Sequence, residues 1–323
     1  MAFFRVGSGF LSQFDTEVRR LMGKKKYSVE RGNEALTVDT SSRHLILNKK
    51  FFDETGIVNL PPAEALAEAL KWRGFLVSGI LAGGEVAIAQ GSTIDDLNAL
   101  REMLREPFYR LTGQSCPPGV MYKVQVVEHN PVALYRVFSM PPSNNSLSST
   151  GENIADWHLF KRYKFGHKVD TRHIDQGVAL LVKVLPLAGV RTFMSCDGHG
   201  RKWPRVWFSG KYNRLWWEAL VQTRLATFAP DLLWEYQSWL EDKDNEGGAL
   251  VIRPRGVRHL NAAALKSVFH DIQNLSRALL EKNLGEQIRE DKLRAIAAMG
   301  DPPEASESIL TIFLESIRKT RLG

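Results

Sequence analysis

Hydrophobic side chains recur at helical spacing in three stretches of the second half of the chain. The first stretch places one apolar face on a helix at Ile174, Val178, Leu181, Val182 and Leu185. A second amphipathic helix is expected from Tyr212 to Leu220 and a third from Ala264 to Leu279. Two shorter helices should follow, separated by the Gly-Asp-Pro-Pro sequence at 300–303. The pattern predicts a helical C-terminal region over residues 259–323.

Shorter apolar runs that precede or separate these helices are typical of strands. Val190 to Met194 has the composition of a buried strand, and Arg205 to Phe208 that of a second one. Leu232 to Leu240 and Leu250 to Arg253 flank a turn sequence at 244–248 and predict a hairpin. Together with the intervening helices, these strands predict a central α/β unit with a mixed sheet over residues 157–258.

The first half of the chain has the pattern of a small α/β unit over residues 1–142. A helix is expected to begin at the proline pair 61–62, because proline is tolerated in a first helical turn. Strands are expected on both sides of a Gly-Gly turn at 83–84, and Ser92 should cap a further helix.

The β-rich runs Val120–Glu128 and Val132–Ser139 are separated by His-Asn-Pro, which predicts a hairpin. The polar stretch that follows is rich in proline and serine, and we interpret residues 143–156 as a linker or mobile loop. The expected fold class is therefore α/β, with α+β as the alternative.

Composition limits the class of protein. A hydrophobic content of 44% in 323 residues is enough for a substantial core. Two cysteines, Cys116 and Cys196, are too few for a disulfide framework and are typical of a reducing compartment. The first residues lack a signal-peptide pattern, and the longest apolar run, 75–84, is too short to cross a bilayer. We expect a cytoplasmic protein without a membrane partner.

The positive charge of the chain is concentrated in one segment. Residues 151–214 hold 12 Lys or Arg against 5 Asp or Glu, whereas the remainder holds 31 of each sign and sums to zero. Such an excess attracts phosphate-bearing partners, although a solvated basic surface gives the same count.

The sequence Ser195-Cys196-Asp197-Gly198-His199-Gly200 lies at the end of a predicted strand, within the basic segment. Gly198 and Gly200 permit positive φ and let backbone N–H groups approach an anion. The residues expected to bind the ligand beside them are Arg172, His173, Ser195, Arg201, Lys202, Trp203 and Arg205. The alternative is that the glycines only form a tight turn between two strands.

Cys196 and His199 give the loop three chemical interpretations. The first is a nucleophilic thiol activated by the imidazole, with Asp197 as the third catalytic residue. The second is a metal site completed by His167, His173 or Asp175. The third is structural, with a buried cysteine and a hydrogen-bonded histidine. Asp175 has its own alternative role as a helix cap.

Aromatic and basic residues alternate from Trp157 to Phe165. Rings that stack on bases beside cations that meet phosphates are typical of nucleic-acid binding. A half-buried strand with a basic outer face has the same alternation.

The stretch from Ile174 to His199 resembles the wybutosine-synthesis methyltransferase family, which acts on tRNA. The matching residues are Asp175, Thr192, Ser195, Cys196 and Gly198. The family has arginine where this chain has His199, and its upstream Lys-Ser signature is missing. The resemblance implies an RNA-facing or nucleotide-facing loop without implying methyl transfer, and no glycine-rich motif identifies a cofactor.

These features lead to three functional hypotheses. The first is recognition of a nucleic acid or nucleotide, with modification of the ligand at Cys196 or His199. The second is a non-catalytic subunit of a larger assembly, which docks a protein partner through its C-terminal helices. The third is a metal-dependent hydrolase.

Overall fold

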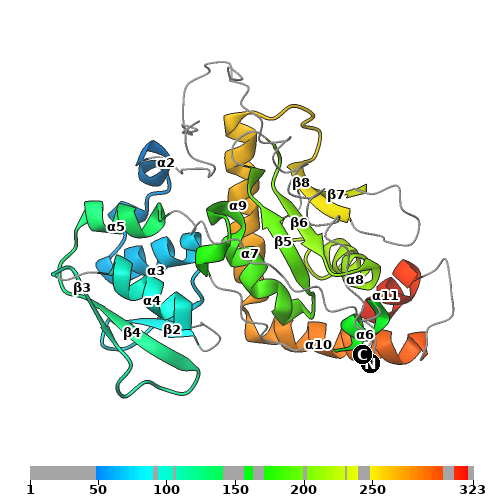
Figure 1. Ribbon diagram of the computed structural model, residues 1–323, viewed down its shortest axis with the longest axis horizontal. Helices are drawn as coiled ribbons and strands as arrows, with labels where there is room; N and C mark the ends of the chain where they lie inside the picture. Colours follow the sequence, from blue (N-terminus) through cyan, green and yellow to red (C-terminus); the bar gives the residue numbers. More distant parts are fainter. Residues whose placement is uncertain are drawn as a thin grey trace, which may run out of the picture. The chain divides into compact units, whose positions relative to one another are not determined.

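The computed structural model describes residues 49–89, 94–104, 107–140, 156–162, 171–198, 202–229, 231–238, 248–300 and 309–318. All of them belong to one compact unit, Ala35–Gly323. This part contains two four-stranded sheets and helices that pack on them (Figure 1), which confirms a fold of mixed helices and strands with a helical C-terminal region. The proposed linker at 143–156 lies almost entirely outside the described residues and stays a prediction.

The N-terminal sheet has the strand order β1-β2-β4-β3. Its strands are β1 (Val77–Ile80), β2 (Val86–Ala89), β3 (Tyr109–Thr112) and β4 (Val120–Val126). The helices of this part are α2 (Lys49–Glu54), η1 (Ile57–Asn59), α3 (Pro62–Arg73), α4 (Ile94–Met103) and α5 (Pro131–Phe138). Two predictions are confirmed, because a proline opens α3 and the Gly-Gly turn joins β1 to β2.

The predicted hairpin at Val120–Ser139 is wrong in its second half, since residues 131–138 form α5. The side chain of Asn130 accepts hydrogen bonds from the backbone N–H groups of Val132 and Ala133, both at 3.0 Å. Pro131 occupies the first helical turn, where its missing N–H has no consequence. Helix capping by the Asn-Pro pair therefore outweighs the β-propensity of the valines that follow.

The second sheet has the order β5-β6-β8-β7. Its strands are β5 (Thr192–Cys196), β6 (Arg205–Phe208), β7 (Leu232–Ser238) and β8 (Gly248–Pro254). Every described ladder is antiparallel, so the expected mixture of parallel and antiparallel strands is not present among these strands. The connection from Cys196 to Arg205 is too short for the helical crossover that parallel neighbouring strands require, so β5 and β6 pair antiparallel. The predicted hairpin of β7 and β8 is confirmed.

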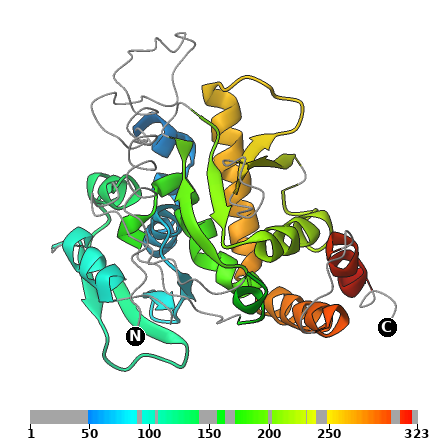
Figure 2. The ribbon, with the colours of Figure 1, turned by 45° about the vertical axis from the view of Figure 1, so that its right-hand side comes forward.

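The helices around this sheet include η2 (Thr171–His173), η3 (Gln176–Val178), α7 (Ala179–Val184), η4 (Leu185–Ala188) and α8 (Lys211–Gln222). The C-terminal helices are α9 (Ala262–Leu279), α10 (Lys282–Met299) and α11 (Ile309–Arg318). Helix α9 packs on α7 and on β8, and Figure 2 shows it beside the sheet. Helix α10 has 18 residues and is longer than predicted.

The apolar faces of the C-terminal helices are buried within the chain. Val268 and Phe313 are fully buried, and α11 packs on both α8 and α10. Among the described residues of these helices, Leu293 is a large hydrophobic side chain that stays exposed. The apolar faces expected to dock a protein partner are thus occupied by the chain itself.

The aromatic and basic segment begins as a helix, α6 (Asp156–Lys161), so the alternative of a half-buried strand does not hold for these residues. Trp157 and Phe160, three residues apart, share one buried helical face and stack with their ring centroids 5.8 Å apart. These rings pack in the core and are not available to stack on bases. None of the described helices is both long and apolar enough to span a membrane.

Buried polar contacts fix the segment that leads into η3. Asp96 of α4 forms an ion pair with Lys183 of α7, and both side chains are buried. The same carboxylate accepts a hydrogen bond of 2.6 Å from the backbone N–H of Thr171. These contacts tie the N-terminal helices to residues 171–175, which carry one of the site residues.

Candidate functional site

The turn after β5 is shaped by Gly198. Its φ is +82°, and a Cβ there would lie 3.2 Å from the backbone carbonyl carbon and oxygen of Trp203. The backbone N–H of Lys202 donates to the Gly198 carbonyl oxygen at 3.1 Å. Both the conformation and the close approach require glycine, as the sequence predicted for this position.

Asp175 reaches this turn from the segment before η3. It occupies the N-cap position of η3, but its side chain makes no capping hydrogen bond. Its Oδ2 accepts instead from the backbone N–H of Asp197 at 3.2 Å. The helix-cap interpretation of the Asp175 side chain is therefore wrong, and the carboxylate bridges two segments 22 residues apart.

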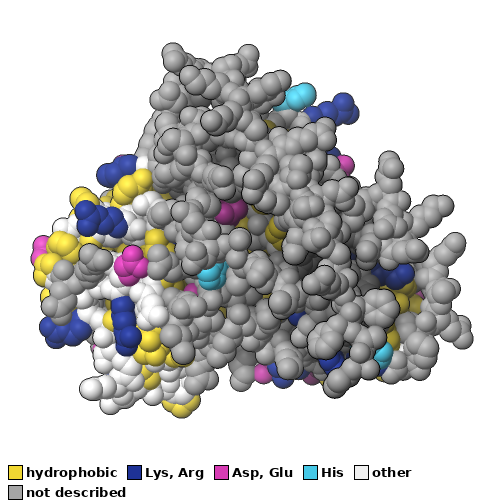
Figure 3. Space-filling model, viewed as in Figure 1, with side chains coloured by type: hydrophobic (Ala, Val, Ile, Leu, Met, Phe, Trp, Pro, Cys, Tyr) yellow, Lys and Arg dark blue, Asp and Glu magenta, His cyan; other side chains and the backbone are white. Residues whose placement is uncertain are grey.

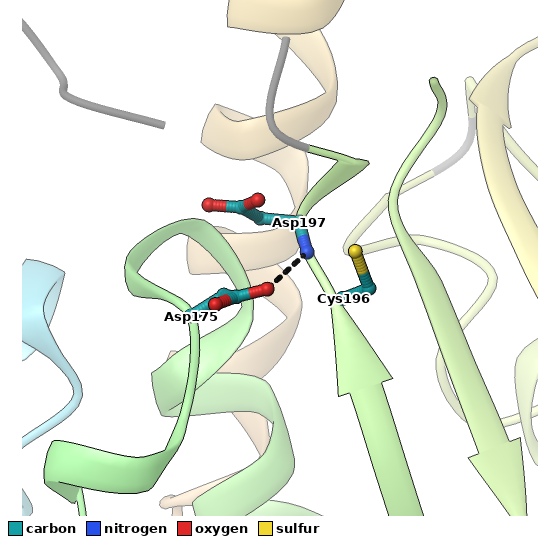
Figure 4. A group of neighbouring side chains, drawn as sticks. All are labelled: Asp175, Cys196 and Asp197. Atoms are coloured by element: carbon teal, nitrogen blue, oxygen red, sulfur yellow. Dashed lines mark hydrogen bonds between the residues drawn. The ribbon is translucent and has the colours of Figure 1, made fainter. Parts of the chain in front are cut away.

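Three potential metal ligands come together at the end of β5. One ligand atom each from Asp175, Cys196 and Asp197 lies within 4.8 Å of the others. Figure 4 shows Asp175 and Asp197 beside each other, with Cys196 adjacent at the end of the strand. Asp197 is 1% exposed, and the other two residues are half-buried. The group is thus partly shielded from water.

The electrostatic surroundings of Cys196 oppose a free thiolate. Burial and the nearby carboxylates of Asp175 and Asp197 raise the pKa of the thiol well above its usual value. The backbone N–H of Gly198, 3.3 Å from Sγ, and the guanidinium of Arg205 act in the opposite direction but are weaker. An activated nucleophile needs a lowered pKa, so these described neighbours do not activate the thiol for nucleophilic catalysis.

Arg205 is a basic residue beside this group, because it pairs with Cys196 in the β5–β6 ladder. Its side chain is half-buried, and its Nε is buried without a hydrogen-bond partner among the described residues. Burial lowers the pKa of the guanidinium, although the Cys196 thiol raises it. Lys202 is exposed at the same turn.

The other residues that the sequence predicted to bind a ligand do not belong to the group of three donors. Trp203 packs against the hydrophobic core and is partly buried, and Ser195 is half-buried in β5. His173 lies in η2, outside the group of three donors. The side chain of Arg172 lies outside the described residues, as do His167, His199, Gly200 and Arg201.

Figure 3 shows one face of the part of the chain that the structure describes. The described Lys and Arg side chains there stand singly among hydrophobic and acidic ones. The ligand-site rule for the carboxyl ends of parallel strands also does not apply, because this sheet is antiparallel. The candidate site at the end of β5 is therefore defined by the three donors and by Arg205.

Comparison with known proteins identifies no relative: no family model, curated protein or solved structure matches the chain. The fold and the site define it as a protein of helices and two antiparallel sheets with a candidate metal centre at the end of β5.

Proposed function

We propose that Asp175, Cys196 and Asp197 bind one divalent metal ion, and that this ion holds a phosphate group of a nucleotide or nucleic acid. The observation that carries the proposal is the convergence of three ligand atoms within 4.8 Å from two separate segments. The group offers a divalent cation two carboxylate oxygens and one thiol sulfur, which are ligands that proteins commonly use for such ions.

The donors favour a metal of intermediate softness. A thiolate selects Zn²⁺ and similar ions over Mg²⁺ and Ca²⁺, which take oxygen ligands. With bonds of about 2.0–2.3 Å, the ligands of a tetrahedral Zn²⁺ lie roughly 3.5 Å apart. The three side chains therefore need to approach one another by roughly 1 Å, which rotation of short side chains supplies. Binding displaces the thiol proton.

The charges around the proposed metal ion leave room for a phosphate ligand. Two carboxylates and one thiolate around a divalent cation leave one negative charge, which the guanidinium of Arg205 offsets. Three protein donors leave the fourth tetrahedral position for another ligand. A phosphate oxygen there would lie near Arg205 and Lys202, within the segment that holds the net charge of the chain. The local resemblance to a tRNA-modifying family points to the same class of ligand.

The metal is tested by titrating the full chain with Co²⁺, a spectroscopic substitute for Zn²⁺. Thiolate ligation gives a charge-transfer absorption band in the near ultraviolet, which should saturate at one equivalent. Cys196→Ser should abolish this band and Cys116→Ser should keep it, because Cys116 lies in the separate β3–β4 connection. Asp175→Asn and Asp197→Asn should weaken binding about tenfold or more. A band of equal intensity in Cys196→Ser would rule the centre out.

The ligand is tested with a fluorescent single-stranded oligonucleotide and with a nucleoside triphosphate, each with and without a chelator. Affinity should fall as salt rises and should fall further when the metal is removed. Asp175→Asn should imitate the chelator, whereas Glu128→Gln, an exposed acidic residue, should not. Affinities that are equal with and without metal would contradict the role given to the ion.

A metal-dependent hydrolase is the second candidate function. The observation that favours it is the set of three protein donors, which is typical of catalytic zinc sites with an open position for water. Hydrolysis of a phosphodiester substrate should then depend on one equivalent of metal and on Asp175. Metal-loaded protein that binds phosphate ligands without hydrolysing them would exclude this second function.

A further inference from the structure

A pocket lies where η1 and α3 face α9, and none of its lining residues belongs to the β5 turn. Its volume is about 230 Å³, and the residues that line it include Ile57, Leu60, Trp72, His270, Gln273 and Arg277. Pockets for drug-sized ligands usually measure about 300–1,000 Å³, so this one suits a ligand of one or two rings.

Gln273 is the unusual residue of this pocket. It is 1% exposed, and both its Oε1 and its Nε2 lack a hydrogen-bond partner among the described residues. Buried side-chain polar atoms are nearly always paired, because an unpaired group loses its hydration without compensation. The Gln273 amide leaves a donor and an acceptor unpaired, side by side in one plane.

The surroundings of Gln273 add apolar walls and one more unpaired donor. Ile57 and Trp72 are buried apolar residues of the lining. The Nε of Arg277 is buried and also lacks a partner among the described residues, while its Nη2 forms an ion pair with Glu68. Burial, together with Lys266 and Arg277, lowers the pKa of His270, so its imidazole is neutral at neutral pH.

We infer that this pocket binds a nucleobase-like heterocycle, whose adjacent hydrogen-bond donor and acceptor pair with the amide of Gln273. A heterocycle in this pocket would lie against its apolar lining, with one edge directed at the amide of Gln273. Glutamine pairs in this bidentate manner with the N6 and N7 atoms of adenine, so adenine is the expected ligand. Both amide atoms of Gln273 are shielded from solvent, so its side chain must change rotamer as the ligand enters.

This inference does not rest on the metal centre, and it concerns a separate site. Lys71 and Arg277 both pair with Glu68, so the charged groups at this end of the pocket carry one net positive charge. The same base can come from a free nucleoside or from a nucleotide within a strand.

The test is calorimetric titration of the full chain with adenine and with unsubstituted purine, which has the same rings but lacks the amino donor. Adenine should bind with one-to-one stoichiometry and at least tenfold more tightly than purine. Gln273→Met should remove this preference, whereas Gln222→Met, on an exposed position of α8, should keep it. A short oligoadenylate is then added to the adenosine complex to identify the source of the base. Displacement of adenosine indicates a base within a strand, and no displacement indicates the free nucleoside.

Two controls separate loss of binding from loss of folding. Gln273→Met should keep or raise the urea midpoint of unfolding, because it removes an unpaired buried amide. Leu60→Trp should block binding by filling the pocket from its half-buried rim. The inference is overturned if adenine does not bind, if it binds no more tightly than purine, or if Gln273→Met binds adenine as the wild type does.

Discussion

Lys292 on α10 is a buried cation whose replacement by methionine should change stability with opposite signs at low and high pH. The side chain is 1% exposed, and its ammonium lies 4.1 Å from the centroid of the Phe160 ring. It donates a hydrogen bond to the carbonyl oxygen of Gly189. Burial lowers the pKa of Lys292 from 10.5 to about 7, so the folded protein binds this proton more weakly than the unfolded chain does.

The magnitude follows from this difference in pKa. Between pH 7 and pH 10.5 the unfolded state binds more protons, so the free energy of unfolding should rise with pH by up to about 1.4 kcal/mol per unit from this group. Below pH 7, the protonated side chain of Lys292 lowers the free energy of unfolding by at most about 5 kcal/mol. Methionine removes that effect but also removes the hydrogen bond to Gly189, which costs about 1–3 kcal/mol.

Lys292→Met should therefore be more stable than the wild type at pH 6, by roughly 2 kcal/mol. The advantage should disappear as pH rises, and at pH 9 the wild type should equal or exceed the variant. Urea unfolding at pH 6, 7, 8 and 9 measures the difference. Lys49→Met, at an exposed lysine, serves as the control and should show no such trend. Parallel pH profiles of the wild type and Lys292→Met would refute the reasoning.

Two further predictions concern the packing that supports the β5 site. Gly177→Ala would place a Cβ 2.2 Å from the Phe269 ring and should lower the free energy of unfolding by about 1–3 kcal/mol. Gly285→Ala, in α10 with open space around it, should raise the same quantity by about 0.5–1 kcal/mol, and a loss of stability there would contradict the packing argument. Asp96→Asn leaves Lys183 buried beside a neutral amide and should cost about 3–5 kcal/mol in urea unfolding. A cost below about 1 kcal/mol would show that this ion pair does not fix the segment before η3.

Local patterns in the sequence predicted much of the second half of the fold. The strand Arg205 to Phe208 and the helix from Tyr212 were predictable because their apolar periodicity is unambiguous. The segment after Asn130 was not, because its valines favour a strand while the Asn-Pro pair caps a helix. There the local signals conflict, and capping determines the outcome.

The candidate site could be predicted only in part. The turn at Gly198 follows from local sequence, since the glycine conformation and the strand before it are both visible there. The sequence offered Asp175 both as a metal ligand and as a helix cap and could not decide between them, because an aspartate before a helix is normally a cap. Only the tertiary packing of η3 brings its carboxylate to Asp197. The unpaired amide of Gln273 has no sequence signal at all, because it depends on segments about 200 residues apart.

The most direct test of the metal centre is X-ray absorption spectroscopy of the full chain loaded with one equivalent of Zn²⁺. We expect the Zn²⁺ ion to have one sulfur ligand at about 2.3 Å and oxygen ligands at about 2.0–2.2 Å. Cys196→Ser should lose the sulfur and keep the oxygens, and Cys116→Ser should match the wild type. A first shell of oxygen and nitrogen alone in the wild-type protein would contradict the proposed centre.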